Sequence, residues 1–171
     1  MNIILCGPSG AGKTTVGKML ATAIGWEWKD TDEIIEKEYG AITQLFKNRG
    51  EEYFRALEKQ TVKSLERCEK LVISTGGGLV VDNGNACSLK KTGKIVYLRT
   101  KKETLLKRLD GSIDRPLLLG ENGENNFLER VRARLPVYEA VADFIVDTDG
   151  LSIEETAKRV IELLKNNGVK L

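Results

Sequence analysis

The sequence predicts an α/β fold in which a five-stranded parallel sheet is flanked by helices. Three features indicate this fold: short runs of β-branched and aliphatic residues, helical periodicity between them, and a glycine-rich loop directly after the first run. Strands that alternate with helices are typical of a parallel sheet covered on both faces. The five strands are expected at residues 2–6, 27–29, 71–74, 94–98 and 144–147.

Helices are expected after the first, fourth and fifth strands. The apolar residues that repeat at helical spacing after the glycine-rich loop are Val16, Met19, Leu20, Ala23 and Ile24. Gly25 stands where it would end this helix. The leucines that indicate a helix after the fourth strand are Leu105, Leu106 and Leu109. Ser152 and Glu155 form a capping-box pattern, which predicts the start of the last helix.

We expect one domain, residues 1–171, with two insertions. Residues 31–67 hold helical segments and no strand, where a simple α/β repeat would have one crossover. Residues 110–126 show no clear periodicity and are rich in Gly, Asn and Asp, and a loop of that length is usually functional or disordered. We therefore expect a substrate-binding helical insertion at 31–67 and a mobile lid at 110–126.

The composition narrows the possible partners and chemistry. The formal net charge is +2, with no block of like charges typical of a nucleic-acid tail and no apolar run long enough to cross a membrane. A strand at residue 2 leaves no room for a signal peptide, and three widely spaced cysteines favour reduced thiols, so we expect a cytoplasmic protein. Because the chain has no histidine, its chemistry must use carboxylates, lysine, arginine or bound ions.

The loop "LCGPSGAGKTT" matches the phosphate-binding pattern G-x-x-x-x-G-K-[ST]. It follows a strand and opens a helix, so its backbone N–H groups and the helix N-terminus would surround a phosphate. Lys13, expected on an exposed loop, would supply charge to the β- and γ-phosphates, and Thr14 would offer a hydroxyl ligand to Mg²⁺. The predicted ATP-binding residues of this loop are Gly7, Gly10, Ala11, Gly12, Lys13, Thr14 and Thr15.

Three classes of protein use such a loop. A switch GTPase normally carries [NT]-K-x-D, which this sequence lacks. An assembly ATPase normally ends a central strand in an acidic residue, but the run 71–74 ends in Ser74, and Asp147 ends a strand expected at the sheet edge. A small-molecule kinase remains, and it needs a second pocket for its acceptor.

Carboxylates and arginines after the second strand are candidates for that pocket. Asp30 and Asp32 are two apart, so in an extended segment they face the same way and could divide the work between Mg²⁺ and an acceptor hydroxyl. The alternative is a helix N-terminus enriched in acids. Arg55 and Glu58 share a helix face, as a fork for a carboxylate or as an exposed ion pair.

Two further features belong to the same hypothesis. Arg134 precedes Pro136, which we expect to end or kink its helix; the alternative for Arg134 is a solvated helix arginine. The run "TGGG" places three glycines directly after a strand, either as a flexible turn or as a close approach to a ligand. In the second case a Cβ at Gly77 or Gly78 would occupy the space of the acceptor, which would meet backbone N–H groups.

The motifs together resemble the shikimate kinases, within the P-loop kinase fold. The resemblance covers nearly the whole chain, through the phosphate loop, "DTD", "FRALE", "TGGG", "DRPLL" and "RLPVYEA" in that order. It implies ATP-dependent phosphorylation of a shikimate hydroxyl to shikimate 3-phosphate, in chorismate and aromatic amino-acid biosynthesis, by a monomer that uses Mg²⁺.

The resemblance also implies a role for each matching residue. Asp32 binds the shikimate hydroxyls and acts as base, and Asp30 reaches Mg²⁺ through water. Arg55 and Arg134 hold the carboxylate, and Glu58 orients Arg55. The remaining residues are Gly76, Gly77 and Gly78 against the ring, Arg108 stacked on adenine, and Arg115 as the lid arginine on the phosphates.

One segment departs from the family pattern, and two other functions stay open. After the last strand, "DTDGLS" offers no cationic contact for adenine. A kinase for another polyol acid or for a nucleotide is the first alternative, and a nucleotide-binding switch is the second. Arg55, Glu58 and Arg134 would form a carboxylate-binding pocket, and this pocket counts against both alternatives.

Overall fold

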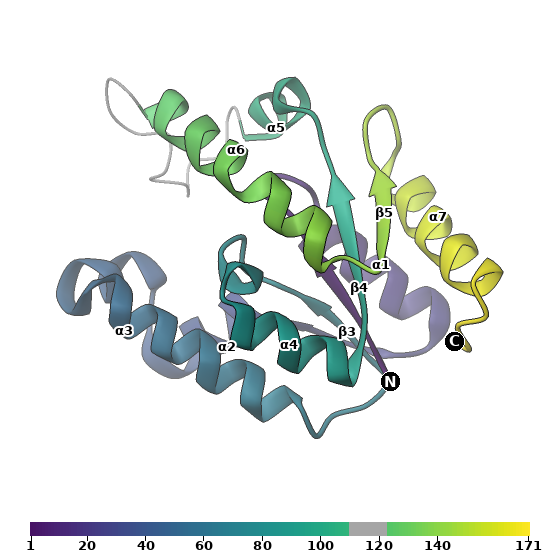
Figure 1. Ribbon diagram of the computed structural model, residues 1–171, viewed down its shortest axis with the longest axis horizontal. Helices are drawn as coiled ribbons and strands as arrows, with labels where there is room; N and C mark the ends of the chain where they lie inside the picture. The colour runs from purple at the N-terminus through teal and green to yellow at the C-terminus, as the bar shows by residue number, and fades with distance from the viewer. Residues whose placement is uncertain (110–122) are drawn as a thin grey trace.

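The computed structural model describes residues 1–109 and 123–171, and Figure 1 shows its arrangement. Its strands are β1 (Asn2–Cys6), β2 (Glu27–Asp30), β3 (Leu71–Ser74), β4 (Gly93–Arg99) and β5 (Phe144–Asp147). They form one parallel sheet in the order β2-β3-β1-β4-β5. The predicted fold is confirmed, and β5 lies at the sheet edge, as expected.

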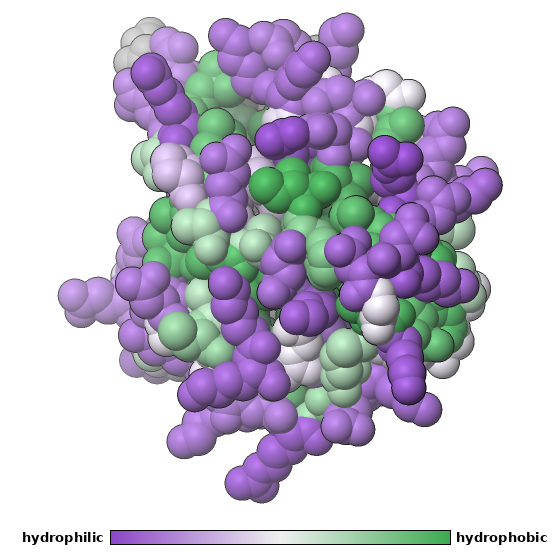
Figure 2. Space-filling model, turned by 45° about the vertical axis from the view of Figure 1, so that its right-hand side comes forward, coloured by the Kyte–Doolittle hydropathy of each residue, from purple (hydrophilic) through white to green (hydrophobic). Residues whose placement is uncertain are grey.

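Helices cover both faces of this sheet (Figure 1). They are α1 (Lys13–Ile24), α2 (Thr31–Tyr39), α3 (Ile42–Leu65), α4 (Asn83–Thr92), α5 (Lys102–Leu109), α6 (Gly123–Val141) and α7 (Ile153–Asn166), with a 3₁₀ turn η1 (Leu79–Val81). None of the helices in the described ranges is both long and apolar enough to span a membrane. Figure 2 shows hydrophilic side chains projecting over most of one face, with hydrophobic groups visible between them.

The alternation of side chains along each strand creates two separate cores. Ile3 and Leu5 pack on the face with α1 and α7, whereas Ile4 and Cys6 pack on the face with α3 and α4. All four are completely buried. Successive side chains of a strand point to opposite faces, so a parallel sheet covered on both sides needs a continuous apolar run.

The first helix is confirmed, but its buried face was only partly predicted. Gly25 caps α1 in the left-handed conformation, at φ 70°. Met19 and Ala23, expected on the apolar face, are exposed. Gly17 is buried in that face instead. A Cβ on Gly17 would lie 2.5 Å from Ser74 Oγ and 2.7 Å from Trp28 Nε1. The helix packs so closely on β2 and β3 that a side chain is excluded.

The other predicted helix features have mixed outcomes. The capping box at the start of α7 is present, with both of its hydrogen bonds. The insertion 31–67 is helical, as α2 and α3, and Gly50 interrupts α3 at φ 82°. Of the two expectations for Pro136, that it ends its helix is wrong, because α6 continues to Val141, and that it kinks the helix stays a prediction. Proline removes only one hydrogen bond, and buried apolar residues on both sides, among them Val131 and Tyr138, hold the helix.

The predicted lid falls mainly outside the described residues. Residues 110–122 lie there, and Arg115 is among them. Residues 123–126 were expected to belong to the loop and instead form the first turn of α6. All five strands end at the same edge of the sheet, and open α/β folds bind ligands at this edge.

Candidate active site

The phosphate-binding loop joins β1 to α1, and its glycines adopt backbone conformations that other residues rarely reach. Gly7, Gly10 and Gly12 have φ values of 140°, 87° and 89°. At Gly7 there is no room for a side chain either, because a Cβ would lie 2.9 Å from Leu98 O. Such turns bring successive N–H groups toward one point at the N-terminus of a helix, which is a favourable place for phosphate.

Lys13 lies at the start of α1 and is buried, so the expectation of an exposed lysine is wrong. Only 9 % of the residue is exposed. Its Nζ donates hydrogen bonds to Gly7 O at 2.9 Å and to Pro8 O at 2.8 Å. The folded loop therefore wraps around the ammonium group.

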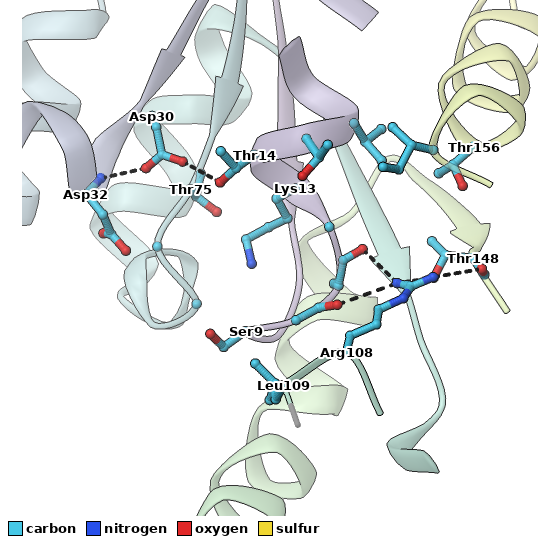
Figure 3. A pocket seen from close by; sticks show the side chains of 18 of the residues that line it. Ser9, Lys13, Thr14, Asp30, Asp32, Thr75, Arg108, Leu109, Thr148 and Thr156 are labelled. Atoms are coloured by element: carbon cyan, nitrogen blue, oxygen red, sulfur yellow. Dashed lines mark hydrogen bonds between the residues drawn. The ribbon is translucent and has the colours of Figure 1, made fainter. Parts of the chain in front are cut away.

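A cavity of about 630 Å³ opens beside this loop. Figure 3 shows Asp30 and Asp32 on one side of it, Arg108 and Thr148 on the other, and Lys13 between them. Its lining comes from the phosphate loop and the start of α1, from the ends of β2 and β3, from the end of α5, and from the segment after β5 with the start of α7. The lining residues other than residues 9–16 are Asp30, Asp32, Thr75, Gly76, Gly77, Arg108, Leu109, Thr148, Leu151, Ser152, Ile153 and Thr156.

Thr14 and Asp30, the predicted metal ligands, lie side by side. The Thr14 hydroxyl donates to Asp30 Oδ2 at 2.8 Å, while Asp30 Oδ1 accepts from the N–H groups of Asp32 at 2.9 Å and Glu33 at 3.4 Å. Asp30 is thus the N-cap of α2. For Asp30, the alternative interpretation as part of a helix N-terminus enriched in acids is therefore confirmed. Asp32 belongs to α2, so the expectation of an extended pair was wrong, although both carboxylates line the cavity.

The oxygens of Thr14 and Asp30 suit Mg²⁺, which prefers oxygen ligands. Within residues 1–109 and 123–171, no three acidic, cysteine or histidine side chains gather to hold a metal ion. A site with so few protein ligands is typical of Mg²⁺ carried by nucleotide phosphates, which together with water complete the coordination.

Asp32 is the carboxylate with the most perturbed titration in the cavity. Burial raises its pKa to about 6, and the nearby Asp30 charge adds to the rise while Lys13 opposes it. Its Oδ1 atom is buried and has no hydrogen-bond partner among the described residues. A buried acceptor without a hydrogen-bond donor lowers the stability of the folded protein, and a ligand hydroxyl could donate the missing hydrogen bond.

Arg55 lies between two glutamates on α3. Its NH1 donates to Glu58 Oε2 and its NH2 to Glu51 Oε1, both at 2.7 Å. Glu58 is 1 % exposed, and burial raises its pKa against the lowering effect of Arg55. The alternative of an exposed ion pair is therefore wrong for Arg55 and Glu58. Glu51 was not singled out from the sequence, although its i, i+4 spacing to Arg55 was visible there.

Two of the three glycines after β3, Gly76 and Gly78, make room for these side chains. A Cβ on Gly76 would overlap Asp32 Oδ1, and one on Gly78 would lie 2.6 Å from Arg55 NH1. At Gly77 the nearest atom, Ser9 N, is 3.6 Å away, an ordinary contact. The expectation that the acceptor meets the N–H groups here is wrong for Gly76, whose N–H donates to Thr31 Oγ1 at 2.9 Å.

Arg134 approaches the same loop from α6. A Cβ on Gly77 would lie 3.9 Å from Arg134 NH1, and the charge of Arg134 opposes the rise that burial causes in the pKa of Glu58. Arg134 is half-buried, so it is not a freely solvated helix arginine. Arg55, Glu58 and Arg134 are not among the residues that line the phosphate-loop cavity, and Arg55 and Arg134 lie next to the glycine loop.

Arg108 connects the phosphate loop to the segment after β5. It donates to Ala11 O and Thr148 O, both at 3.3 Å (Figure 3). The Thr148 hydroxyl also pairs with that of Thr100 at 2.7 Å. Thr148 was not predicted, because no local pattern in "DTDGLS" marks its threonine as a residue of the site. Asp147 pairs with Arg99 at the sheet edge, so it does not imitate a metal-binding acid of an ATPase.

Comparisons with known proteins agree with this geometry. The model of the shikimate kinase family matches residues 9–165. The shikimate kinase of Thermodesulfovibrio yellowstonii is 42 % identical over 162 residues, which cover 94 % of this chain and 93 % of that protein. The shikimate kinase of Methylococcus capsulatus is 38 % identical over 171 residues, covering 99 % of this chain and 96 % of its own.

Solved structures give the same result. A shikimate kinase from Acinetobacter baumannii in complex with shikimate superposes with a TM-score of 0.92 at 38 % identity, covering 99 % of this chain and 95 % of that one. A deoxyadenosine kinase from M. mycoides with bound dATP shares the fold alone, at a TM-score of 0.64 and 17 % identity, covering 96 % of this chain and 100 % of its own. Motifs, site geometry and relatives coincide, and this chain belongs to the shikimate kinase family.

Proposed function

We propose that this protein transfers the γ-phosphoryl group of ATP to a hydroxyl of shikimate, forming shikimate 3-phosphate for chorismate biosynthesis. The observation that carries the proposal is the position of Asp32. Its buried Oδ1, unmatched within the described residues, lies at the boundary between the phosphate-loop cavity and the Arg55–Glu58 cluster. A carboxylate placed there can meet a hydroxyl on one side and the phosphate site on the other.

The phosphate loop binds the nucleotide. Its N–H groups and the N-terminus of α1 hold the phosphates, and Lys13 contributes the charge that stabilises the transferring group. Thr14 and Asp30 would hold Mg²⁺, Asp30 through water. When bound, the ion neutralises charge on the β- and γ-phosphates. Arg108 lies at the far side of the cavity, where it would contact the base.

The acceptor carboxylate binds at the arginines beside the cavity. Arg55 presents a planar guanidinium, which can make two parallel hydrogen bonds to a carboxylate. Glu58, buried beneath it, restrains its orientation through the 2.7 Å contact. Arg134 adds a second positive charge next to Gly77. This arrangement favours an acidic acceptor, such as shikimate, over a neutral sugar or a nucleoside.

Asp32 orients the acceptor hydroxyl and receives its proton. With a pKa of about 6, the carboxylate is ionised at neutral pH and still close enough to that pH to take up a proton. Phosphoryl transfer has a loose transition state, so placing the hydroxyl is the larger part of its task. Arg115, outside the described residues, remains a prediction from the family resemblance, as the lid arginine near the phosphates.

We propose that the enzyme acts as a monomer in the cytoplasm. The support for that compartment is that Cys6, Cys68 and Cys87 are all free thiols.

The proposal is tested by initial rates of ADP release with ATP and Mg²⁺. We expect release to depend on shikimate and to be low both without an acceptor and with a shikimate analogue that lacks the carboxylate. Release that is equally fast without shikimate would indicate a nucleotide-binding switch or an ATPase. Faster release with another polyol acid would indicate a related kinase.

A further inference from the structure

Tyr138 on α6 contacts the glycine loop directly. Its hydroxyl donates a hydrogen bond to Gly77 O at 2.5 Å, and the residue is completely buried. Its ring packs against Tyr97 of β4, with ring centroids 5.3 Å apart. Burial raises the pKa of Tyr138 to about 12, so the hydroxyl keeps its proton and remains a donor at neutral pH.

This hydrogen bond restricts the peptide that joins Gly77 to Gly78. A peptide unit is planar and trans, so its C=O and N–H point in opposite directions. When the Tyr138 hydroxyl holds Gly77 O, the N–H of Gly78 therefore points away from Tyr138. The backbone hydrogen bonds of the described residues include none donated by Gly78, and a Cβ on Gly78 would lie 2.6 Å from Arg55 NH1.

A loop of three glycines needs such an external restraint. Glycine loses more conformational freedom on ordering than any other residue, and Gly76, Gly77 and Gly78 have no side chains with which to hold themselves. Gly76 is restrained by the hydroxyl of Thr31, and Tyr138 supplies the corresponding restraint at Gly77. Both partners are buried side chains on helices, which makes them rigid supports.

Tyr138 also connects this loop to Arg134. The two residues are four apart on α6, so they lie on one face of the helix, and the nearby charge of Arg134 opposes the rise in the Tyr138 pKa. Tyr138 thus lies beside both parts of the acceptor site that do not come from α2 or α3: the glycine loop and Arg134.

We propose that Tyr138 is a positioning residue for the acceptor. It fixes the Gly77–Gly78 peptide and Arg134 relative to Arg55, so that the Gly78 N–H and both guanidinium groups meet the acceptor in one geometry. This inference rests on the proposed function, because it assigns the acceptor to the cluster of Arg55 and Arg134. Tyr138 itself touches no reacting atom.

The test uses the full-length enzyme and a matched pair of variants. Tyr138→Phe removes only the hydroxyl and keeps the packed ring. Tyr97→Phe removes the hydroxyl of the neighbouring ring, which is buried without a hydrogen-bond partner among the described residues. We expect Tyr138→Phe to raise KM for shikimate about tenfold, in line with the loss of one hydrogen bond, while KM for ATP changes less than twofold. Tyr97→Phe should leave both KM values unchanged.

A second measurement reports on the loop without turnover. In ¹H–¹⁵N spectra of the free protein, the Gly78 amide signal should shift or broaden in Tyr138→Phe and stay in place in Tyr97→Phe. Equal kinetics in the two variants, or a loss of melting temperature in Tyr138→Phe with unchanged KM values, would overturn the positioning role. A wild-type enzyme that fails to phosphorylate shikimate would overturn the proposed function instead, and the amide signal would still show whether Tyr138 orders the loop.

Discussion

Asp32 occupies the space that a side chain at Gly76 would need, because a Cβ built there would overlap Asp32 Oδ1. Gly78 has the same relationship to Arg55, whose NH1 would lie 2.6 Å from a Cβ. The two glycines have ordinary backbone angles, so it is space and not conformation that excludes other residues. The glycine loop allows a carboxylate and a guanidinium from the helical insertion to lie against the end of β3.

Gly76→Ala should therefore damage catalysis by displacing Asp32. We expect at least a 100-fold loss of kcat/KM for shikimate, because the new methyl group forces the carboxylate from its position. Melting temperature should also fall, since the overlap exists in the free protein. Gly77→Ala is the matched control for the free protein: its Cβ meets only ordinary contacts among described atoms, and its melting temperature should stay close to wild type. Similar melting temperatures in both variants would contradict the packing account.

Asp32→Asn should stabilise the free protein while it abolishes most phosphoryl transfer. The fold raises the pKa of Asp32 from 3.8 to about 6, so the ionised carboxylate costs stability above pH 6, and this cost disappears as the pH falls below about 4. The rise corresponds to about 3 kcal/mol, and we expect a gain of about 1–2 kcal/mol at pH 8 because solvent screens part of the effect.

Urea unfolding in the presence of a chelator, at pH 8 and at pH 4, measures this gain. The stabilisation should be present at pH 8 and absent at pH 4. Glu33→Gln, one residue further along α2 and exposed, is the control and should give no gain at either pH. A variant Asp32→Asn that is less stable than wild type at pH 8 would show that the charge supports the fold.

Lys13→Ala should lower both turnover and stability. Loss of a positive charge at the transferring phosphate typically removes several kcal/mol of transition-state stabilisation, which predicts a fall in kcat of at least 100-fold. The buried Nζ also holds Gly7 O and Pro8 O, so thermal unfolding of the free protein should shift to lower temperature. Lys18→Ala, on an exposed face of α1, provides the comparison in both assays. Near-normal turnover in Lys13→Ala would exclude its role at the phosphates.

Arg55→Lys should be harmful although it keeps the charge. Lysine cannot form the planar fork that matches a carboxylate, so we expect kcat/KM for shikimate to fall at least tenfold. The slow reaction of a shikimate analogue without the carboxylate should be affected much less. Arg49→Lys, which changes an exposed arginine of the same helix, should affect neither. Equal losses on the two acceptors would mean that Arg55 does not bind the carboxylate.

Much of this fold and site follows from local patterns in the sequence. The strands and the loop around Lys13 are visible because apolar runs, glycine spacing and a lysine at a helix start are local signals. Arg55 and Glu58 were found for the same reason, since a helix brings residues three apart together.

What the sequence did not show depends on contacts between distant segments. The burial of Gly17 comes from Trp28 and Ser74, which pack against it from two strands. The hydrogen bond from Tyr138 to Gly77 joins residues 61 positions apart. The continuation of α6 through Pro136 depends on packing that overrides a local preference. Such relationships become visible only when the elements are assembled.

³¹P NMR of the purified enzyme with ATP, Mg²⁺ and shikimate, followed over time, can show whether a hydroxyl of shikimate is phosphorylated at the site around Asp32. We expect one new phosphate-ester signal, coupled to the proton at C3 of shikimate, that grows as the γ-phosphate signal of ATP declines and is lost in Asp32→Asn. Formation of inorganic phosphate in place of an ester, or an ester formed equally well by Asp32→Asn, would contradict this expectation.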